Sequence, residues 1–551
     1  MILIMKRYIT LAVIATFCWS VASAQQEGLP SRSLTIEGAY NPTMTKTDKI
    51  MPVPQRPATE RRPAAVSYLT DPNPITRQER KPMGAFSETS DDVRYSSYDG
   101  LVRFGYGLRN SHDGVLDFNW RLSDRDILHV DGLLDAWASK PVPTWKSRMF
   151  NADLNAEYSH RFDQFTFSVN GAIGHSHFNY REGASLDSAK AVLSSLMQKV
   201  SRGELGVSLA GKTDEMEWHF KTGMELLSRK GLDVAGTMRP NKERLIRIEG
   251  GAAMPLLGGT GGLDYRQKSA MYDWQGLYGC AYDGFTTLTF SPYWKQSWSD
   301  LDAQLGLNID IRTAAGHKFM ASPMVTASYR FFDERFRLNA GLTGGLEDNN
   351  MRAVAAISPY WSEVERIRDG YTLTNAFLGV SFSQGTWLTL SAKAGYRHVI
   401  DDLFQTVQDS LIVTSLLVQE ASDVLYARLD ADMQFTEKAQ VRMDVTYSKY
   451  TGKYSAGSLM FKPVVDASLF GRVNIIPGLD ALLTYRHITY HKIDGVRMHS
   501  VNDLGLTFDY DFRPNLSFYL TGSRLAGGDF CYYAGYRAIK PAVLLGVSYR
   551  F

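Results

Sequence analysis

The sequence lacks three features that would place it in a simple class: long apolar runs, an excess of one charge, and a set of cysteines. Beyond residue 24, no run of about 18 apolar residues occurs, which excludes a protein that crosses a membrane with helices. The 60 Lys and Arg residues nearly match the 58 Asp and Glu residues. Because binding to phosphate backbones requires a clear basic excess, nucleic acid is not an expected partner.

The chain contains only three cysteines. Cys18 falls within the expected leader peptide described below, which leaves Cys280 and Cys531 in the mature chain. Two cysteines do not form the dense disulfide framework of a small secreted domain, and the sequence leaves open whether they pair. At 44% hydrophobic and 12% aromatic residues, the chain also holds too much apolar material to stay disordered along its length.

The first 24 residues have the three parts of a secretory signal peptide. Lys6 and Arg7 supply the positive charge, residues 8–19 form the apolar core, and Ala22-Ser23-Ala24 is a small-residue cleavage site. We therefore predict that the chain is exported and that the leader is removed near Ala24.

Residues 25–95 differ in composition from the rest and are predicted to form an extended periplasmic arm. Closely spaced prolines between Pro42 and Pro82 interrupt regular structure, and several arginines add positive charge. Only Leu34, Thr35, Ile36 and Glu37 have the composition of a short strand. Such a strand could add to the sheet edge of a periplasmic or outer-membrane partner.

From residue 96 to residue 551, apolar and polar residues alternate with the period of two that is typical of β-strands. In the segment 301–312, for example, Leu305 and Leu307 fall on one face, and Asn308 and Asp310 fall on the other. The alternating segments run for roughly 9 to 14 residues, whereas an ordinary strand has five or six.

The connections between these segments alternate between short turns and mostly longer polar loops such as 181–199, 348–369 and 401–422. Aromatic residues such as Trp218 and Trp294 flank the short turns. This layout is typical of an outer-membrane β-barrel with aromatic belts at the membrane borders. The short turns fall at residues 123–125, 162–164, 213–214, 258–261, 299–300, 332–334, 384–385, 436–437, 477–478 and 513–515.

These ten turns predict an all-β, antiparallel transmembrane barrel of about 22 strands, with both chain ends on the short-turn side. The turns at 258–261 and 299–300 are weaker than the others, so 18 or 20 strands are also compatible with the pattern. The alternative is a set of soluble β-sandwich domains with one wet face per sheet. The long strands and the absence of any hinge-like linker favour the barrel.

The last strand carries a more specific pattern. Apolar or aromatic residues occupy alternate positions up to the end of the sequence, at Val543, Leu545, Val547, Tyr549 and Phe551. This pattern resembles the C-terminal recognition signal of bacterial outer-membrane barrel proteins. The resemblance implies a Gram-negative outer membrane, insertion by the barrel-assembly machinery, and contact with outer-membrane lipid and lipopolysaccharide.

The face predicted to line the lumen carries charges of both signs. These charges could form a wet wall of salt bridges, or they could guide a charged solute through the barrel. Because no ring of a single sign occurs, strong ion selectivity is not predicted. The lumen-facing charges are Asp310, Arg312, Arg428, Asp430, Asp432, Arg442 and Asp444.

No catalytic, cofactor or metal site emerges from the sequence, and we do not expect an enzyme. Serine and aspartate are plentiful, but nothing pairs one of them with a placed base. His175 and His177 share one strand face and could bind a metal, or they could lie at a solvated strand end. Glycine pairs such as Gly344-Gly345 lack the strand–loop–helix context of a phosphate loop.

The strand number, long loops and large lumen are similar to the barrel half of TonB-dependent receptors. Those receptors carry a globular plug domain before the barrel, whereas here only the arm of about 70 residues is present. Leu34 to Glu37 resembles their short energy-coupling box. In addition, Tyr40-Asn41-Pro42, Lys49-Ile50 and Pro52 resemble the start of plug-less TonB-dependent receptor-like barrels.

The resemblance implies a transport or receptor function, in which the barrel binds or passes solutes and the arm serves as a small stopper. The alternative is a structural or assembly barrel whose arm binds a periplasmic or outer-membrane partner. The sequence names neither the solute nor the partner.

Overall fold

The computed structural model describes residues 99–551, apart from 143–144, 184–196, 214, 231–239, 274–283, 314–317, 333–334, 364–366, 386, 410–411, 437, 456, 494–495 and 539. The predicted signal peptide, the arm with its strand at Leu34 to Glu37, and Cys280 lie outside the described residues. In the described part, no helix is long and apolar enough to cross a membrane.

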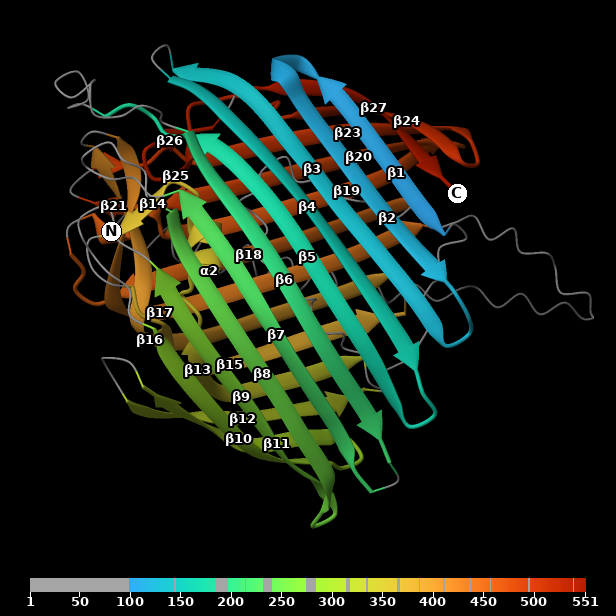
Figure 1. Ribbon diagram of the computed structural model, residues 1–551, viewed down its shortest axis with the longest axis vertical. Coiled ribbons are helices and arrows are strands. Elements are labelled where there is room, and N and C mark those ends of the chain that lie inside the picture. The colour runs from blue at the N-terminus through green and yellow to red at the C-terminus, as the bar shows by residue number, and fades with distance from the viewer. Residues whose placement is uncertain are drawn as a thin grey trace, which may run out of the picture. The chain divides into compact units, whose positions relative to one another are not determined.

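The described chain folds into one antiparallel sheet that closes on itself (Figure 1). Strand β1 (Gly100–Gly107) pairs with β2 (Ser111–Arg121) on one side and with β27 (Ala542–Arg550) on the other. The first and last strands are therefore neighbours, and the ring contains 22 strands. This confirms the predicted all-β barrel and its strand number.

Between β2 and β27 the ring strands follow one another in chain order. They are β3 (Asp126–Val142), β4 (Trp145–Arg161), β5 (Phe165–Asn179), β6 (Met197–Lys212), β7 (Glu217–Lys230), β8 (Pro240–Leu256), β9 (Gly259–Asp273), β10 (Phe285–Ser297), β11 (Leu301–Arg312), β12 (Phe319–Phe331), β13 (Phe336–Glu347), β15 (Gly370–Gln384), β16 (Leu388–Asp409), β17 (Val413–Thr436), β18 (Ala439–Thr451), β19 (Pro463–Ile476), β20 (Leu479–Tyr490), β23 (Val501–Arg513) and β24 (Leu516–Ser523).

Short elements occur in the connections at one end of the ring. They are η2 (Leu108–Asn110), α2 (Met351–Ile357), β14 (Trp361–Glu363), η4 (Ser458–Phe461), β21 (Lys492–Ile493), β22 (Val496–Arg497), β25 (Cys531–Tyr533) and β26 (Tyr536–Arg537).

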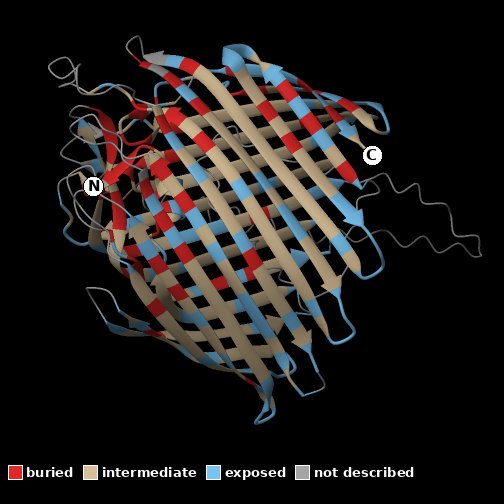
Figure 2. Cartoon of the chain, in the orientation of Figure 1, coloured by how far each residue is buried: buried red, intermediate tan, exposed pale blue. Residues whose placement is uncertain are grey.

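The alternation of the sequence becomes the two faces of the barrel wall. Leu545 and Val547 of β27 are 63% and 43% exposed on the outer face, whereas the alternate residues Gly546 and Ser548 are buried on the inner face. In Figure 2, exposed and buried residues form bands along strands whose other residues are of intermediate exposure. Because the side-chain period of a strand is two, the pairing register decides which set of residues faces outward.

All ten predicted short turns join neighbouring strands at the same end of the ring. Aromatic rings form contacts between strands at this end. Phe165 of β5 lies 6.3 Å from Trp218 of β7 between ring centroids, and Phe336 of β13 lies 4.7 Å from Phe382 of β15. The aromatic residues expected beside the short turns therefore lie side by side around the barrel.

The seam between the first and last strands depends on two glycines. Gly105 of β1 and Gly546 of β27 are directly opposite each other. The absence of side chains leaves room for Tyr519 of β24, whose hydroxyl donates to Asp113 of β2 at 2.7 Å. The Arg103 guanidinium lies 3.5 Å from the centroid of the Tyr519 ring. One tyrosine thus connects the four strands that meet at the closure.

We predict that Gly546→Val destabilises the barrel by about 1–3 kcal/mol, the usual range for overpacking. A Cβ atom at Gly546 would lie 2.1 Å from the Tyr519 ring, so the ring would have to leave the seam. The measurement is the temperature at which the folded barrel loses its fast migration in unboiled gels. Gly203→Val is the matched control, because a Cβ at Gly203 meets nothing within 4 Å. Equal shifts in both variants would contradict this account.

Candidate functional site

At the end of the ring opposite the short turns, three chain segments fold together into a structure that we call the cap. The first is the connection 348–369, which contains α2 and β14. The second is the outer part of the β16–β17 hairpin, residues 402–420, and the third is the hairpin 531–537, which contains β25 and β26. Figure 1 shows α2, β14, β25 and β26 gathered at this end.

The β16–β17 hairpin bends where it leaves the wall. The pairing register shifts between Val399 and Asp402, and Asp401 between them has a positive φ of 56°. Beyond this bulge the two strands stay paired as far as Asp409 and Val413. A β-bulge kinks a strand locally, which explains how the hairpin changes direction without losing its backbone hydrogen bonds.

The hairpin reaches the opposite wall of the barrel. The amide of Val413 donates to the carbonyl of Arg181 at 3.0 Å, and Ile412 forms an isolated bridge with Glu182. Arg181 follows β5, which is the fifth strand of the ring, whereas Val413 begins β17, which is the sixteenth of 22. Strands eleven positions apart in such a ring face each other, so the cap crosses the lumen.

The other two segments pack onto this bridge. Strand β14 pairs in parallel with β17, with Trp361 opposite Ser415. The hydroxyl of Ser415 donates to the carbonyl of Ala534 in the third segment at 3.1 Å, and the hydroxyl of Ser358 lies 2.8 Å from that of Ser415. The cap is therefore a small hydrogen-bonded layer with its own side-chain contacts.

A cluster of aromatic side chains attaches the cap to the wall of β4 and β5. Tyr360 stacks on Tyr536 with ring centroids 3.6 Å apart, and both rings contact Trp145 edge-on. Phe178 lies 5.0 Å from Tyr360. All four of these side chains are buried, with at most 4% exposed. Burial raises the pKa of Tyr360, so its hydroxyl stays protonated at physiological pH.

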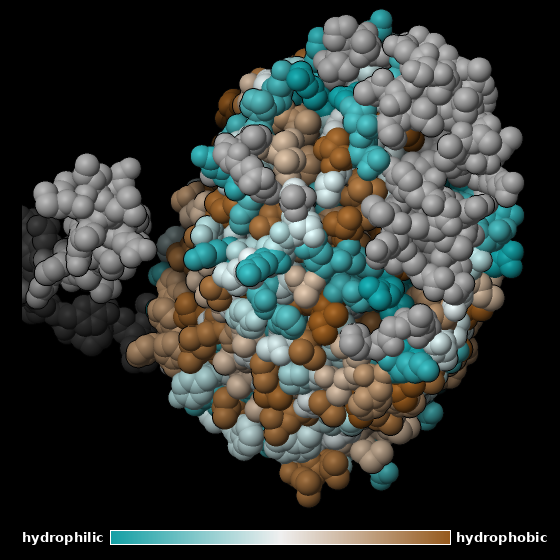
Figure 3. All heavy atoms as spheres, turned by 90° about the vertical axis from the view of Figure 1, so that its left-hand side faces the viewer, coloured by the Kyte–Doolittle hydropathy of each residue, from teal (hydrophilic) through white to brown (hydrophobic). Residues whose placement is uncertain are grey.

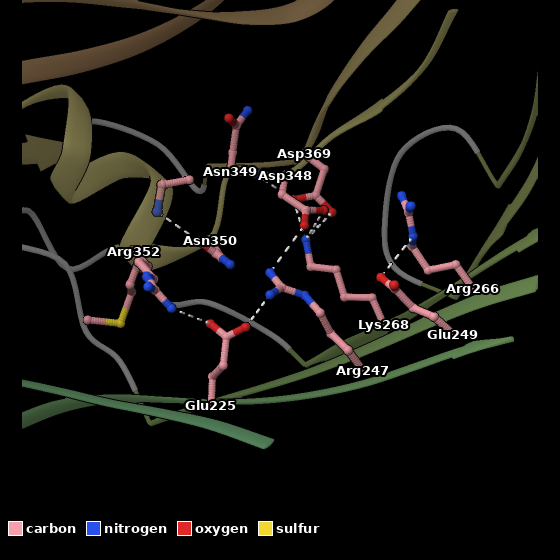
Figure 4. A network of polar contacts seen from close by, with 12 residues as sticks. Glu225, Arg247, Glu249, Arg266, Lys268, Asp348, Asn349, Asn350, Arg352 and Asp369 are labelled. Carbon is pink, nitrogen blue, oxygen red and sulfur yellow. Dashed lines mark hydrogen bonds and ion pairs between the residues drawn. The ribbon is translucent and has the colours of Figure 1, made fainter. Parts of the chain in front are cut away.

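A network of charged residues attaches the cap to the wall of β6 to β11 (Figure 4). The Lys268 ammonium of β9 lies 2.7 Å from Asp348 and 3.1 Å from Asp369, the two ends of the first cap segment. The side chains of Lys268 and Asp369 are only 3% and 2% exposed. Arg312 of β11 approaches Asp369 at 3.5 Å. Charges buried this deeply are tolerated because they are paired.

The network continues toward the helix of the cap. Arg247 of β8 pairs with Glu225 of β7 and lies 3.3 Å from Asp348. Arg352 of α2 lies 3.0 Å from Glu204 and 3.5 Å from Glu225, both on the wall. Figure 4 shows the chain of contacts from Arg352 through Glu225 and Arg247 to Asp348.

Two further contacts hold the same segment. The amide of Met351, the first residue of α2, donates to Glu243 of β8 at 2.8 Å, while Asn350 caps the helix by accepting from the amide of Ala353. Arg229 of β7 donates to the carbonyl of Trp361 at 3.1 Å, and its guanidinium lies 4.5 Å from the Trp361 ring centroid.

Ion pairing also sets the pKa of Asp348, which lies in the loop just beyond β13. Burial alone raises the pKa of this carboxyl, but the Lys268 ammonium outweighs that effect, and Arg247 and Arg266 add to it. The pKa of Asp348 therefore lies below its ordinary value of 3.8. Asp348 is charged at neutral pH, as the ion pair requires.

The predicted lumen-facing charges fall into two groups. Asp310 is buried and accepts a hydrogen bond from Tyr371, and Arg312 meets the cap through Asp369. The other five lie on β17 and β18, away from this network. Arg428 pairs with Asp430 at 2.7 Å, Arg442 pairs with Asp432 at 2.9 Å, and Asp444 lies opposite Asp430 in the strand register.

The residues of the C-terminal pattern lie on the outer face, where Val543, Leu545, Val547, Tyr549 and Phe551 are 39–63% exposed. The carbonyl of Phe551 accepts from the amides of Asp99 and Gly100, and its ring lies 5.7 Å from Phe118.

His175 and His177 do share one face of β5, with ring centroids 6.1 Å apart, and His177 stacks on Phe150. Within the described ranges, no group of three or more metal-binding side chains occurs.

The cap itself was not anticipated from the sequence. Residues 348–369 looked like one long polar loop, although the apolar stretch Met351 to Ile357 and the pair Tyr360-Trp361 are unusual for a solvated loop. These apolar and aromatic residues indicate that the loop packs against other parts of the protein. The sequence does not indicate which of the many charged strand residues contact this loop, so Lys268 and Arg229 could not be identified as its partners.

No protein-family model matches the sequence, and no curated protein matches it. Several solved structures share its fold. A variant of the ferric enterobactin receptor PfeA from Pseudomonas aeruginosa matches with a TM-score of 0.61 at 14% identity, over 82% of this chain and 81% of the receptor. The siderophore receptor PirA from Acinetobacter baumannii matches with 0.61 at 14%, over 82% and 80%. The ferric-catecholate import receptor Fiu from E. coli matches with 0.59 at 12%, over 82% of each chain.

The chain has the barrel fold of these receptors. The resemblance to TonB-dependent receptor barrels is thereby confirmed at the level of fold. At 12–14% identity, the likeness concerns the path of the chain and not the side chains of the site.

We predict that Lys268→Gln loosens the cap, because it leaves buried Asp369 with less compensating charge and removes the ion-pair partner of the more exposed Asp348. Removing one partner of a buried ion pair costs about 3–5 kcal/mol, and the lower end applies because Arg312 remains. The measurement is deuterium uptake by peptides from residues 348–369, which should accelerate. Arg125→Gln is the control, since its ion pair with Asp163 is largely exposed and contributes below about 1 kcal/mol. Unchanged uptake in Lys268→Gln would contradict the role of the network.

We also predict how the cap responds to pH. Because the folded-state pKa of Asp348 is lowered, its stabilising contribution is present above pH 3.8 and is lost as the pH falls below that value. A fluorophore on Ala356→Cys, an exposed position of α2, in a Cys280→Ser, Cys531→Ser background should show constant polarisation from pH 8 to about 5 and a fall below about 4. Asp348→Asn should reduce this acid transition. A transition centred near pH 6 would show that other groups hold the cap.

Proposed function

We propose that this protein is an outer-membrane barrel of transport or receptor type, similar to TonB-dependent receptors, which binds or passes a solute without chemical conversion. The fold shared with siderophore receptors supports this proposal. So do the signal peptide expected at residues 1–24 and the C-terminal pattern ending in Phe551. In this proposal, residues 25–95 form the periplasmic arm and residues 96–551 form the barrel.

The two ends of the ring would then face different compartments. Short turns of outer-membrane barrels face the periplasm, and long loops face the exterior. The chain termini of the ring, at Gly100 and Phe551, lie with the short turns, so the arm would enter from the periplasm. The cap would lie at the outer end, where an arriving solute meets the barrel first.

The observation that carries the proposal is the cap spanning a lumen lined with polar groups. A ring of 22 strands is too wide for its own side chains to fill. In this protein the β16–β17 hairpin crosses that space and contacts the end of β5. A barrel that only anchored an arm would have no need of a structured barrier there, whereas a gated transporter or receptor requires one.

The character of the barrier also suits gating. The cap attaches to β6 to β11 through ion pairs and to the neighbouring strands β4 and β5 through stacked aromatic rings. A solute that competes for the charged contacts could loosen that attachment while the aromatic contacts act as a hinge. Paired charges of both signs along β17 and β18 favour a wet wall over an ion-selective pore.

The test is planar-bilayer conductance of four forms: the mature protein, Lys268→Gln/Tyr360→Ala, a deletion of residues 26–95, and the combination. If the cap and the arm both obstruct the lumen, the combined form should have the highest conductance. Each single change should give a conductance between those of the mature protein and the combined form. Arg125→Gln in the full chain is the control and should behave like the unmodified protein.

The pattern of results separates the alternatives. Conductance that rises with the cap variant alone would assign the barrier to the cap, and a rise only with the deletion would assign it to the arm. A lumen that stays closed in all four forms would contradict a transport function. It would favour a structural barrel whose arm binds a partner.

A further inference from the structure

A cavity lies at the short-turn end of the ring, opposite the cap, and we infer that it binds a short peptide with free termini. Its volume is about 520 Å³, within the roughly 300–1,000 Å³ of small-molecule sites. It lies against the turn-side ends of β4 to β10, and Figure 1 shows β4 to β9 side by side. Figure 3 views the molecule from the side of the cap, so the cavity belongs to the far end in that view.

One row of the strand register crosses the cavity. The side chains of this row point into the lumen, because the alternate positions Phe220 and Leu263 are 40% and 48% exposed on the outer face. The row has a cation at one end and an anion at the other, and all its members except the glycine line the cavity. Its residues, each directly opposite the next on six neighbouring strands, are Arg161, Thr166, Ala210, His219, Gly251 and Asp264.

The middle of the row is low, because Gly251 has no side chain. A Cβ atom on Gly251 would overlap Asp264 Oδ1 and would lie 2.5 Å from His219 Cε1. The carboxylate and the imidazole therefore converge above this glycine. Beside them, Tyr293 of β10 lies over Gly262, where a Cβ atom would be 2.5 Å from the tyrosine hydroxyl. Three groups that form hydrogen bonds thus meet above a floor of small residues.

The polar side chains of the cavity are not used by the protein itself. Among the described residues, the side chains of Arg161, His219, Asp264 and Tyr293 have no hydrogen-bond or ion-pair partner. A ligand with a single charge would leave one end of the row uncompensated. A ligand that carries both a carboxylate and an ammonium group complements both ends.

The neighbouring charges already have partners. Lys212 pairs with Glu217, and the turn residue Asp163 pairs with Arg125 at 2.9 Å. Lys295 does not line the cavity, and its ammonium lies 4.7 Å from the centroid of the tyrosine ring of β10. The unpaired cation and anion of the row are therefore the groups that distinguish this surface.

The length of the row sets the size of the ligand. Arg161 and Asp264 are five strand spacings apart, which is about 24 Å between their backbones. The long arginine side chain covers part of this distance, and an extended peptide of about four residues, at roughly 3.5 Å each, covers the rest. Its carboxylate would bind the guanidinium through two parallel hydrogen bonds, and its ammonium would bind Asp264. Thr166 and His219 lie between, where the peptide amides need donors and acceptors.

This inference rests on the proposed function and names the class of solute. On a route through the barrel, the cavity is among the last surfaces that a solute meets before it leaves by the short-turn end.

The experiment measures binding of tetra-alanine to the full-length mature protein in detergent by isothermal titration calorimetry. Two further probes are tetra-alanine with an acetylated amino terminus and tetra-alanine with an amidated carboxyl terminus. Each should bind about 10- to 100-fold more weakly than the free peptide, because each loses one hydrogen bond between charged groups.

Two variants connect each terminus of the peptide to one residue. Arg161→Gln should bind the free peptide and the amidated probe equally, and Asp264→Asn should bind the free peptide and the acetylated probe equally. The matched control is Arg330→Gln/Asp302→Asn, which removes a cation and an anion from the same end of the ring outside the cavity. It should keep both preferences.

Loss of each preference in its own variant supports the inference. Absence of binding, equal affinity for all three probes, or preferences that survive in both variants would overturn it, provided that fast gel migration shows each variant to be folded. The conductance measurements remain separate. A barrel that binds the peptide but stays closed in all four forms would contradict the proposed function, whereas conductance without peptide binding would overturn only the peptide site.

Discussion

The pairing of backbone N–H and C=O groups around a closed ring is the interaction on which the rest of the structure depends. A sheet with an open edge would leave these groups unpaired in apolar surroundings, at a cost of several kcal/mol for each group. The pairing of β1 with β27 removes that edge. At the seam, Gly105, Gly546 and Tyr519 show how closely closure constrains side-chain size. The register set there also decides which face of every strand is turned outward.

Strand number then determines what the interior requires. Because a ring of 22 strands leaves a wide lumen, the chain must either leave it open or bring in additional segments. The connection 348–369 and the hairpin 402–420 are such segments. Buried charges are costly to desolvate, so the pair of Lys268 with Asp369 fixes the position of the first segment more than it adds to stability. The contacts with Tyr360 and Tyr536 supply apolar burial on the other side.

The parts of the molecule that the sequence predicted are those controlled by nearest neighbours in the chain. Alternation identified the outward residues, such as Leu305 and Leu545, and all ten short turns were located. The cap was missed because its contacts join residues far apart, such as Lys268 and Asp369, which are 101 positions apart.

The sequence by itself determined the all-β class and the face of each strand and limited the ring to 18 to 22 strands, because turn chemistry and a period of two are local properties. The tertiary structure decided which charges meet and what crosses the lumen. Ring closure places β5 opposite β17, eleven strands away, so that the amide of Val413 meets the carbonyl of Arg181. No pattern within either strand encodes that meeting, since it follows from the curvature of the whole sheet.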